Sequence, residues 1–257
     1  MSAPHLAAPR VALFVTCLVD AMRPRVGFAA ISLLEAAGCA VEIPRGQTCC
    51  GQPALNSGDH NGAAAVARRV IALCEGYDAV VVPSGSCGGT IRAHYPELFP
   101  EGSDWRRRAE ALAAKTYELI SYLADVRRWR PERVALKATA TYHDSCSGLR
   151  ELGVKAQPRK LLAAVDGLEI VEMEGADTCC GFGGTFCVKY PAISNAIVSE
   201  KTASVAATGA ELLLGGDLGC LMNMAGRLHR EGRTARVYHA AEVLAGMGDG
   251  PAIGEEP

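Results

Sequence analysis

Residues 47–53 read QTCCGQP, and the Cys-Cys-Gly at their centre, Cys49 to Gly51, recurs 130 positions later as Cys179 to Gly181. One cysteine precedes each pair and another follows it, giving C-x31-CC-x36-C in the first half of the chain and C-x32-CC-x39-C in the second. This repeated order and near-equal spacing indicate an internal duplication. Eight of the 11 cysteines thus form two quartets: Cys17, Cys49, Cys50 and Cys87, and then Cys146, Cys179, Cys180 and Cys220.

Short apolar runs alternate with helical patterns around these cysteines. The strand-like runs are residues 11–17, 39–44, 77–83, 138–146, 167–173 and 210–215. The helical patterns cover residues 28–38, a stretch ending near 75–76, and residues 158–165 and 192–207. Alternation of strand and helix predicts a parallel sheet covered by helices. We therefore expect two similar Rossmann-like α/β domains, residues 1–130 and 131–257, related by the duplication.

The single cysteines follow apolar strand-like runs. In parallel α/β sheets, sites form outside the carboxyl ends of the strands, where loops turn into helices. The N-terminal end of a helix lowers a thiol's pKa and favours the thiolate, which is the form that binds metal. Gly51 and Gly181 give the chain the freedom to bend, so that both cysteines of each adjacent pair can face one centre.

Four thiolates suit a zinc ion or an iron–sulfur cluster. Structural zinc sites usually use two short C-x2-4-C knuckles, and the quartets contain none. An adjacent pair with its other two ligands more than thirty residues away favours a larger, multi-iron centre. We expect iron–sulfur in at least one half, and zinc stays open as an alternative at one site.

The three remaining cysteines have plainer interpretations. Cys39 opens the apolar stretch CAVEI and Cys74 ends the helical run VARRVIALC, so both are predicted to fill the apolar core. Cys187 lies seven residues after Cys180, close enough to act as an auxiliary group at the second site. His143, just before Cys146, is a candidate to shuttle protons or to hydrogen-bond a cluster sulfide, or it orders only its own loop.

Composition excludes several classes of protein. The chain has 257 residues, and a hydrophobic content of 49% rules out intrinsic disorder. Its formal net charge of −2 provides no overall positive charge for binding nucleic acid or an anionic membrane. Uncharged stretches such as residues 79–91 are too short for a membrane-spanning helix. The start MSAPHLAAPR does not resemble a signal peptide, so a reducing cytoplasm is expected. The sequence contains no nucleotide-binding or hydrolase motif, which leaves the quartets as its strong chemistry.

Four stretches beside the quartets carry a family resemblance. They are PSGSCGG (83–89), YHDSCSGLRELGV (142–154), CCGFGGTFCVKYP (179–191) and GGDLGCLMN (215–223). Over roughly residues 11–244 the chain resembles the duplicated CCG cysteine-rich domain of the heterodisulfide reductase B-subunit type, and within it the lactate-utilisation protein A group.

The resemblance implies an iron–sulfur electron-transfer subunit of a cytoplasmic complex that oxidises L-lactate to pyruvate. Such a subunit would lack complete oxidoreductase activity alone, and its partners would be ferredoxin-like iron–sulfur and other subunits. Two alternatives remain open: a heterodisulfide reductase-like thiol–disulfide catalyst, and a zinc-stabilised interaction protein.

The chain departs from the fuller family pattern at two positions. In the heterodisulfide reductase type the motif ends C-x-x-C, which gives five cysteines per site; here Ser84 and Asp217 stand where the first of those two would be. A four-cysteine [4Fe-4S] cluster, one per CCG motif, is therefore expected. Ser84 and Asp217 are candidates for auxiliary oxygen ligands, although helix N-caps explain them at least as well.

Overall fold

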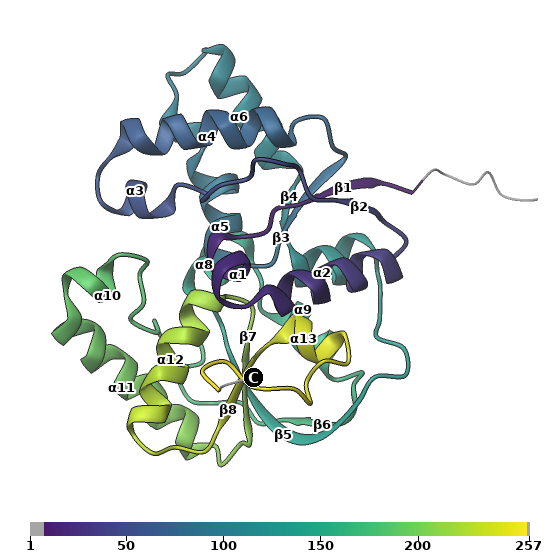
Figure 1. Cartoon of the computed structure of the whole chain (residues 1–257), viewed down its shortest axis with the longest axis vertical. Helices are drawn as coiled ribbons and strands as arrows, with labels where there is room; N and C mark the ends of the chain where they lie inside the picture. Colours follow the sequence, from purple (N-terminus) through teal and green to yellow (C-terminus); the bar gives the residue numbers. More distant parts are fainter. Residues whose placement is uncertain (1–7, 256–257) are drawn as a thin grey trace, which may run out of the picture.

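The computed structural model describes residues 8–255 and contains one four-stranded parallel sheet in each half of the chain (Figure 1). In spatial order the first sheet consists of β2 (Ala40–Glu42), β1 (Arg10–Leu13), β3 (Ala79–Val82) and β4 (Thr116–Glu118). The second consists of β6 (Asp166–Ile170), β5 (Ala135–His143), β7 (Leu212–Gly215) and β8 (Arg236–His239). Both sheets place their strands in the same order, which confirms the prediction of two similar α/β units.

Helices connect and cover the strands in both halves. Those of the first half are α1 (Cys17–Met22), α2 (Pro24–Ala36), α3 (Gln52–Asn56), α4 (His60–Cys74), α5 (Gly85–Gly89), η1 (Thr90–His94), η2 (Pro96–Leu98), α6 (Asp104–Ala114), α7 (Leu119–Ser121) and η3 (Tyr122–Val126). Those of the second are α8 (Cys146–Leu152), α9 (Ala156–Leu162), α10 (Phe186–Lys189), α11 (Pro191–Ala207), α12 (Leu218–Arg230) and α13 (Ala240–Leu244). The domain boundary near residue 130, between η3 and β5, stays a prediction.

The central strands are buried on both faces, as their unbroken apolar sequences predict. All four residues of β3, Ala79–Val82, are buried. Because side chains alternate along a strand, Val80 and Val82 belong to an outer core with α4 and α6, whereas Val81 faces the opposite way. A corresponding outer core in the second half packs α11 and α12 against β7 and β8.

A third core is shared by the two halves. It contains Leu33 and Leu34 of α2 together with Leu161 of α9 and Val243 and Leu244 of α13, and each of these side chains is almost fully buried. In Figure 1 the first half occupies the upper part of the molecule and the second the lower part, with α2 lying above α13. Burial of apolar side chains from both halves in one cluster ties the two sheets together.

The strands before the single cysteines end earlier than the sequence suggested. We expected a strand through Cys17, but β1 ends at Leu13 and Cys17 is the first residue of α1. Cys146 likewise begins α8, after β5 has ended at His143. The physical reason lies in the residue before each cysteine: Thr16 and Ser145 are helix N-caps, whose side chains accept hydrogen bonds from Val19 and Gly148.

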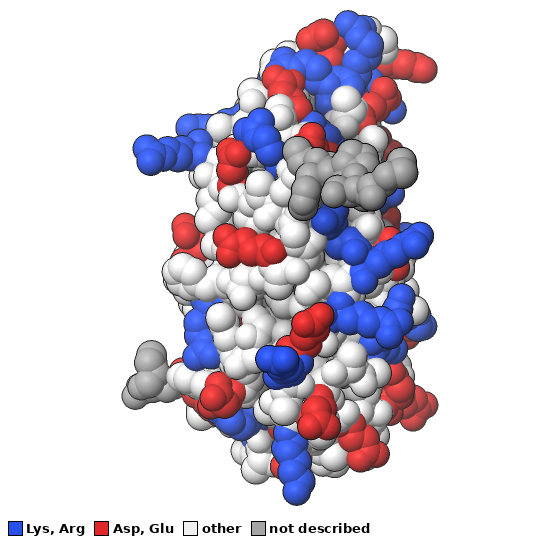
Figure 2. Space-filling view, turned by 90° about the vertical axis from the view of Figure 1, so that its right-hand side faces the viewer, with Lys and Arg blue, Asp and Glu red and all other residues white. Residues whose placement is uncertain are grey.

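The surface carries charges of both signs. Figure 2 shows basic and acidic side chains from top to bottom of the face it draws, separated by uncharged surface. Among residues 8–255, no helix combines the length and the apolar character that crossing a membrane requires.

Candidate metal-binding sites

The first quartet comes together at the carboxyl-terminal side of the first sheet. Cys17 lies at the start of α1, Cys87 is the third residue of α5, and Cys49 and Cys50 lie on the loop before α3. The Sγ atoms of Cys50 and Cys87 are 3.3 Å apart. The Cys49 sulfur accepts side-chain hydrogen bonds from the thiols of Cys17 and Cys50. The four sulfur atoms therefore form one continuous chain of contacts.

The second quartet repeats this arrangement. Cys179 interacts with Cys146 and with Cys180 through side-chain hydrogen bonds, and Cys180 in turn contacts Cys220. Cys146 begins α8 and Cys220 is the third residue of α12, as Cys17 and Cys87 are in α1 and α5. The structure thus brings together all four predicted residues in each half, in the same order.

Each of the four single cysteines lies in the first turn of a helix. The N-caps of these helices are Thr16, Ser84, Ser145 and Asp217, and each accepts a hydrogen bond from a backbone N–H of the first turn. Free N–H groups and the positive end of the helix dipole favour negative charge at this place. The helix starts therefore offer positive partial charge beside these four sulfurs, although hydrogen bonding to a neighbouring cysteine and then burial raise the pKa of Cys17 and of Cys146.

Ser84 and Asp217 act as N-caps and also contact each other across the two halves. The N–H of Cys87 donates to Ser84 Oγ at 3.3 Å, and that of Cys220 donates to Asp217 Oδ1 at 3.4 Å. Ser84 Oγ donates to Asp217 Oδ2 at 2.9 Å, and the N–H of Ser86 donates to the same oxygen at 2.9 Å. These bonds account for both side chains structurally, and a ligand role for either remains only a prediction.

The two Cys-Cys-Gly loops turn at their glycines. Gly51 and Gly181 have φ of 87° and 80°, in the left-handed region that favours glycine. Their N–H groups donate to the preceding Cys49 and Cys179 sulfurs, at 3.4 and 3.3 Å. A Cβ on Gly181 would lie 2.8 Å from the carbonyl oxygen of Ser194, so the loop packs closely on α11.

Neighbouring side chains fix the same backbone carbonyl in both loops. The Tyr95 hydroxyl donates to the carbonyl of Cys50 at 2.7 Å, and the Asn223 amide donates to that of Cys180 at 2.8 Å. Tyr95 is fully buried. Neither residue was identified from the sequence, because nothing in their spacing relates them to the quartets.

One sulfur in each quartet is favoured as a thiolate. Hydrogen bonds from Cys17 and then Cys50 lower the pKa of Cys49 to about 2, and hydrogen bonds from Cys146 and then Cys180 lower that of Cys179 to about 2. The pKa of Cys17 is raised correspondingly, first because it donates to Cys49 and then because of burial. Within each quartet the hydrogen bonds therefore concentrate thiolate character on one sulfur of the adjacent pair.

A cavity of about 220 Å³ opens onto the first quartet. It is lined on one side by Cys17, Cys50 and Cys87, and on the other by residues of the second half, including Phe182 and Leu218. The approach to the first quartet is therefore shaped by both halves of the chain.

The other cysteines lie apart from these contacts. Cys39 is buried in the shared core and Cys74 in the outer core of the first half, as predicted. The Cys187 thiol donates to the carbonyl of Gly184 at 3.5 Å. An auxiliary role for Cys187 stays a prediction.

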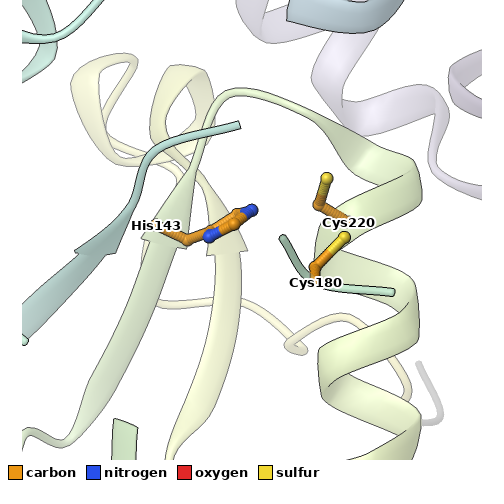
Figure 3. Close-up of side chains that lie close together, drawn as sticks. All are labelled: His143, Cys180 and Cys220. Carbon is orange, nitrogen blue, oxygen red and sulfur yellow. The ribbon is translucent and has the colours of Figure 1, made fainter. Parts of the chain in front are cut away.

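His143 lies next to two cysteines of the second quartet, a proximity that the sequence did not predict. Its ring and the sulfurs of Cys180 and Cys220 each offer a potential ligand atom, and these atoms lie within 4.8 Å of one another (Figure 3). Burial, and next the charge of Lys201, lowers the pKa of His143 to about 3, so the imidazole is neutral at neutral pH.

The donor sets fit a sulfur-bound metal. Thiolates are soft ligands that select zinc or iron–sulfur clusters over magnesium or calcium. Each quartet offers four sulfurs from three separate segments, with one of them favoured as a thiolate. The sites thus have the composition and the convergence that such a centre requires.

This duplicated α/β fold with two cysteine quartets defines a protein with two cysteine-rich domains. The CCG cysteine-rich domain model matches residues 11–92 and again residues 140–225. The chain is 50% identical to lactate utilization protein A of an Exiguobacterium species over 238 residues, covering 92% of this chain and 97% of that protein. It is 48% identical to lactate utilization protein A of Bacillus subtilis over 235 residues, covering 91% and 98%. The chain belongs to the lactate utilization protein A family.

A solved structure shares the fold at low sequence identity. A hypothetical protein from Helicobacter pylori superposes with a TM-score of 0.65 at 11% identity, covering 96% of this chain and 52% of that one. This likeness concerns the fold alone, and it agrees with the two-unit α/β architecture.

Proposed function

We propose that the chain holds one iron–sulfur centre, a [4Fe-4S] cluster, in each half and transfers electrons within a lactate-oxidising complex. The observation that carries the proposal is the convergence of two equivalent sets of four thiols at corresponding places of two duplicated sheets. Iron–sulfur clusters held by four cysteines accept and release single electrons.

The residues of the chain have three tasks in this proposal. The eight quartet cysteines hold the centres, and the first turns of α1, α5, α8 and α12 offset their negative charge. The N–H groups of Gly51 and Gly181 hydrogen-bond the adjacent cysteine sulfurs, and such bonds tune a cluster's potential. Burial of Cys50, Cys180 and Cys220 limits access of water to the sulfurs.

The names of the relatives support lactate as the substrate of the complex. Oxidation of lactate to pyruvate releases two electrons and two protons, and the chain's proposed part is to receive or relay the electrons. We assign the chemistry at lactate itself to partner subunits, and the partners that would pass electrons on are ferredoxin-like iron–sulfur proteins. A cytoplasmic location is part of the same proposal.

A thiol–disulfide catalyst is the second candidate. Two observations favour it: the 3.3 Å separation of the Cys50 and Cys87 sulfurs, and the cavity that opens onto them between the two halves. A disulfide substrate in that cavity would reach cysteines of the first quartet.

The test is the spectrum and redox behaviour of protein purified without oxygen. The proposal predicts a brown protein with iron, inorganic sulfide and an electron paramagnetic resonance signal after one-electron reduction. Lactate should reduce it only when the partner subunits are present. A colourless protein with zinc as its sole metal would contradict the proposal, and turnover of a disulfide substrate by the isolated chain would favour the second candidate.

A further inference from the structure

His143 is a buried polar side chain whose ring nitrogens lack a well-formed hydrogen bond within residues 8–255. It is the last residue of β5 and is only 1% exposed. Neither Nδ1 nor Nε2 forms a hydrogen bond of good geometry among the described residues, although an interaction with the Ala176 backbone carbonyl acts to raise the pKa of the ring. A neutral imidazole has one N–H donor and one lone pair, and leaving the lone pair unsatisfied in the interior costs free energy. The position is therefore poorly explained by packing alone.

The imidazole lies against two cysteines of the second quartet. Figure 3 shows His143 at the end of its strand, with Cys180 of the Cys-Cys-Gly loop and Cys220 of α12 on the other side of a small gap. The three potential ligand atoms lie within 4.8 Å of one another, and all three residues are buried. A nitrogen lone pair and two sulfurs thus converge on one small volume.

The first half has an apolar residue at the matching place. Phe14 stands three residues before Cys17, as His143 stands three residues before Cys146. Phe14 is fully buried and belongs to the same apolar cluster as Cys50. A phenyl ring therefore satisfies the fold at this position, and the imidazole of the second half adds a donor atom that the fold itself does not need.

We infer that His143 supplies a nitrogen ligand to the metal centre of the second quartet, so that the two halves hold chemically different centres. This inference rests on the proposed function. Neutral imidazole is a common ligand of iron and zinc, with a metal–nitrogen distance of about 2.0–2.1 Å for zinc. The first centre has no such nitrogen ligand, and the ligand set of an iron–sulfur centre helps to set its potential, so the two centres are expected to differ in potential.

The test isolates the second quartet in the full-length chain. Cys49→Ser and Cys50→Ser remove two ligands of the first quartet, and the reduced, metal-free protein is titrated with Co²⁺ without oxygen. Absorption bands of Co²⁺ report its sulfur and nitrogen ligands, and pulsed electron paramagnetic resonance on protein labelled with ¹⁵N-histidine detects a bound imidazole. The matched variant is His143→Phe, which places in the second half the residue found in the first.

With His143 present, one histidine nitrogen should couple strongly to Co²⁺, and the affinity should exceed that of His143→Phe at least about tenfold. Equal affinities with no strong nitrogen coupling would overturn the inference while leaving thiolate binding intact. If neither chain bound Co²⁺ through thiolates, the proposed function would fall and this inference with it.

A folding control accompanies the titration. Circular dichroism and thermal unfolding of the metal-free chains check that His143→Phe has not disturbed the second sheet. If that variant does not fold, His143→Gln takes its place, since an amide keeps the polarity but lacks the imidazole nitrogen. The same loss of coupling and affinity is then expected, and unchanged affinity would overturn the inference.

Discussion

Glu118 is a fully buried carboxyl group at the contact between the two halves. It is the last residue of β4; its Oε2 accepts a hydrogen bond from the N–H of Ser121 at 2.9 Å, while its Oε1 has no partner among the described residues. Burial is the main cause that raises its pKa from 4.5 to about 7, and the charge of Asp217 adds to it. The folded protein therefore binds a proton here that the unfolded chain releases.

The sign of the effect on stability follows from this difference. Between pH 4.5 and pH 7 unfolding releases the proton, so rising pH lowers the free energy of unfolding. A pKa of about 7 against 4.5 corresponds to a total loss of about 3 kcal/mol, of which about 2 kcal/mol falls between pH 5.5 and pH 8. Glu118→Gln removes the titrating group and keeps an oxygen that can cap α7.

Urea unfolding of metal-free, reduced protein at pH 5.5 and pH 8 measures the effect. The stability of Glu118→Gln relative to the unaltered chain should rise by about 2 kcal/mol between the two pH values. Glu42→Gln is the control. Hydrogen bonds from Arg10 and then Tyr77 lower the pKa of the exposed Glu42, so its contribution to stability is lost only at lower pH. The difference in free energy of unfolding between Glu42→Gln and the unaltered chain should therefore be the same at pH 5.5 and pH 8. A constant difference for Glu118→Gln as well would refute the reasoning.

Two further predictions concern the loops and caps that position the quartets. Gly181→Ala should destabilise the protein more than Gly209→Ala in thermal unfolding. Both glycines have positive φ, which costs alanine about 1–2 kcal/mol. Only Gly181 also lacks space for a Cβ, so its replacement should cost more. Equal losses would show that close packing on α11 is unimportant. Asp217→Ala should cost about 1–2 kcal/mol through loss of a helix cap and of the bond from Ser84, whereas Asp217→Asn should retain most of the stability. A loss in chemical denaturation as large for Asn as for Ala would contradict the capping role.

The architecture was largely predictable because the strongest signals were local. Unbroken apolar runs such as residues 79–82 predicted buried parallel strands, and the duplicated cysteine spacing predicted two equivalent halves. The edge strands β4 and β8 were missed: β4 has only three residues, and Arg236–His239 has a mixed composition. The shared core was also unforeseen, because which helices of the two halves meet is decided by packing that no periodicity encodes.

The grouping of the cysteines was predictable, whereas their surroundings were not. Spacing alone assigned each cysteine to its quartet, and the N-cap interpretation of Ser84 agrees with its bond to the first turn of α5. The bond between Ser84 and Asp217 joins residues 133 positions apart, a contact that depends on how the two halves pack. The position of His143 against Cys180 and Cys220 likewise required the fold, since the sequence places it next to Cys146.

The central claim is that each quartet holds its own metal centre, and metal stoichiometry tests it most directly. Iron, sulfide and zinc are counted per chain in protein prepared without oxygen. The measurement is made on the unaltered chain, on Cys50→Ser, on Cys180→Ser and on Cys39→Ala, the last being a control in the shared core. We predict two centres in the unaltered chain and in Cys39→Ala, and one in each quartet variant. A metal content that neither quartet variant changes would contradict the account.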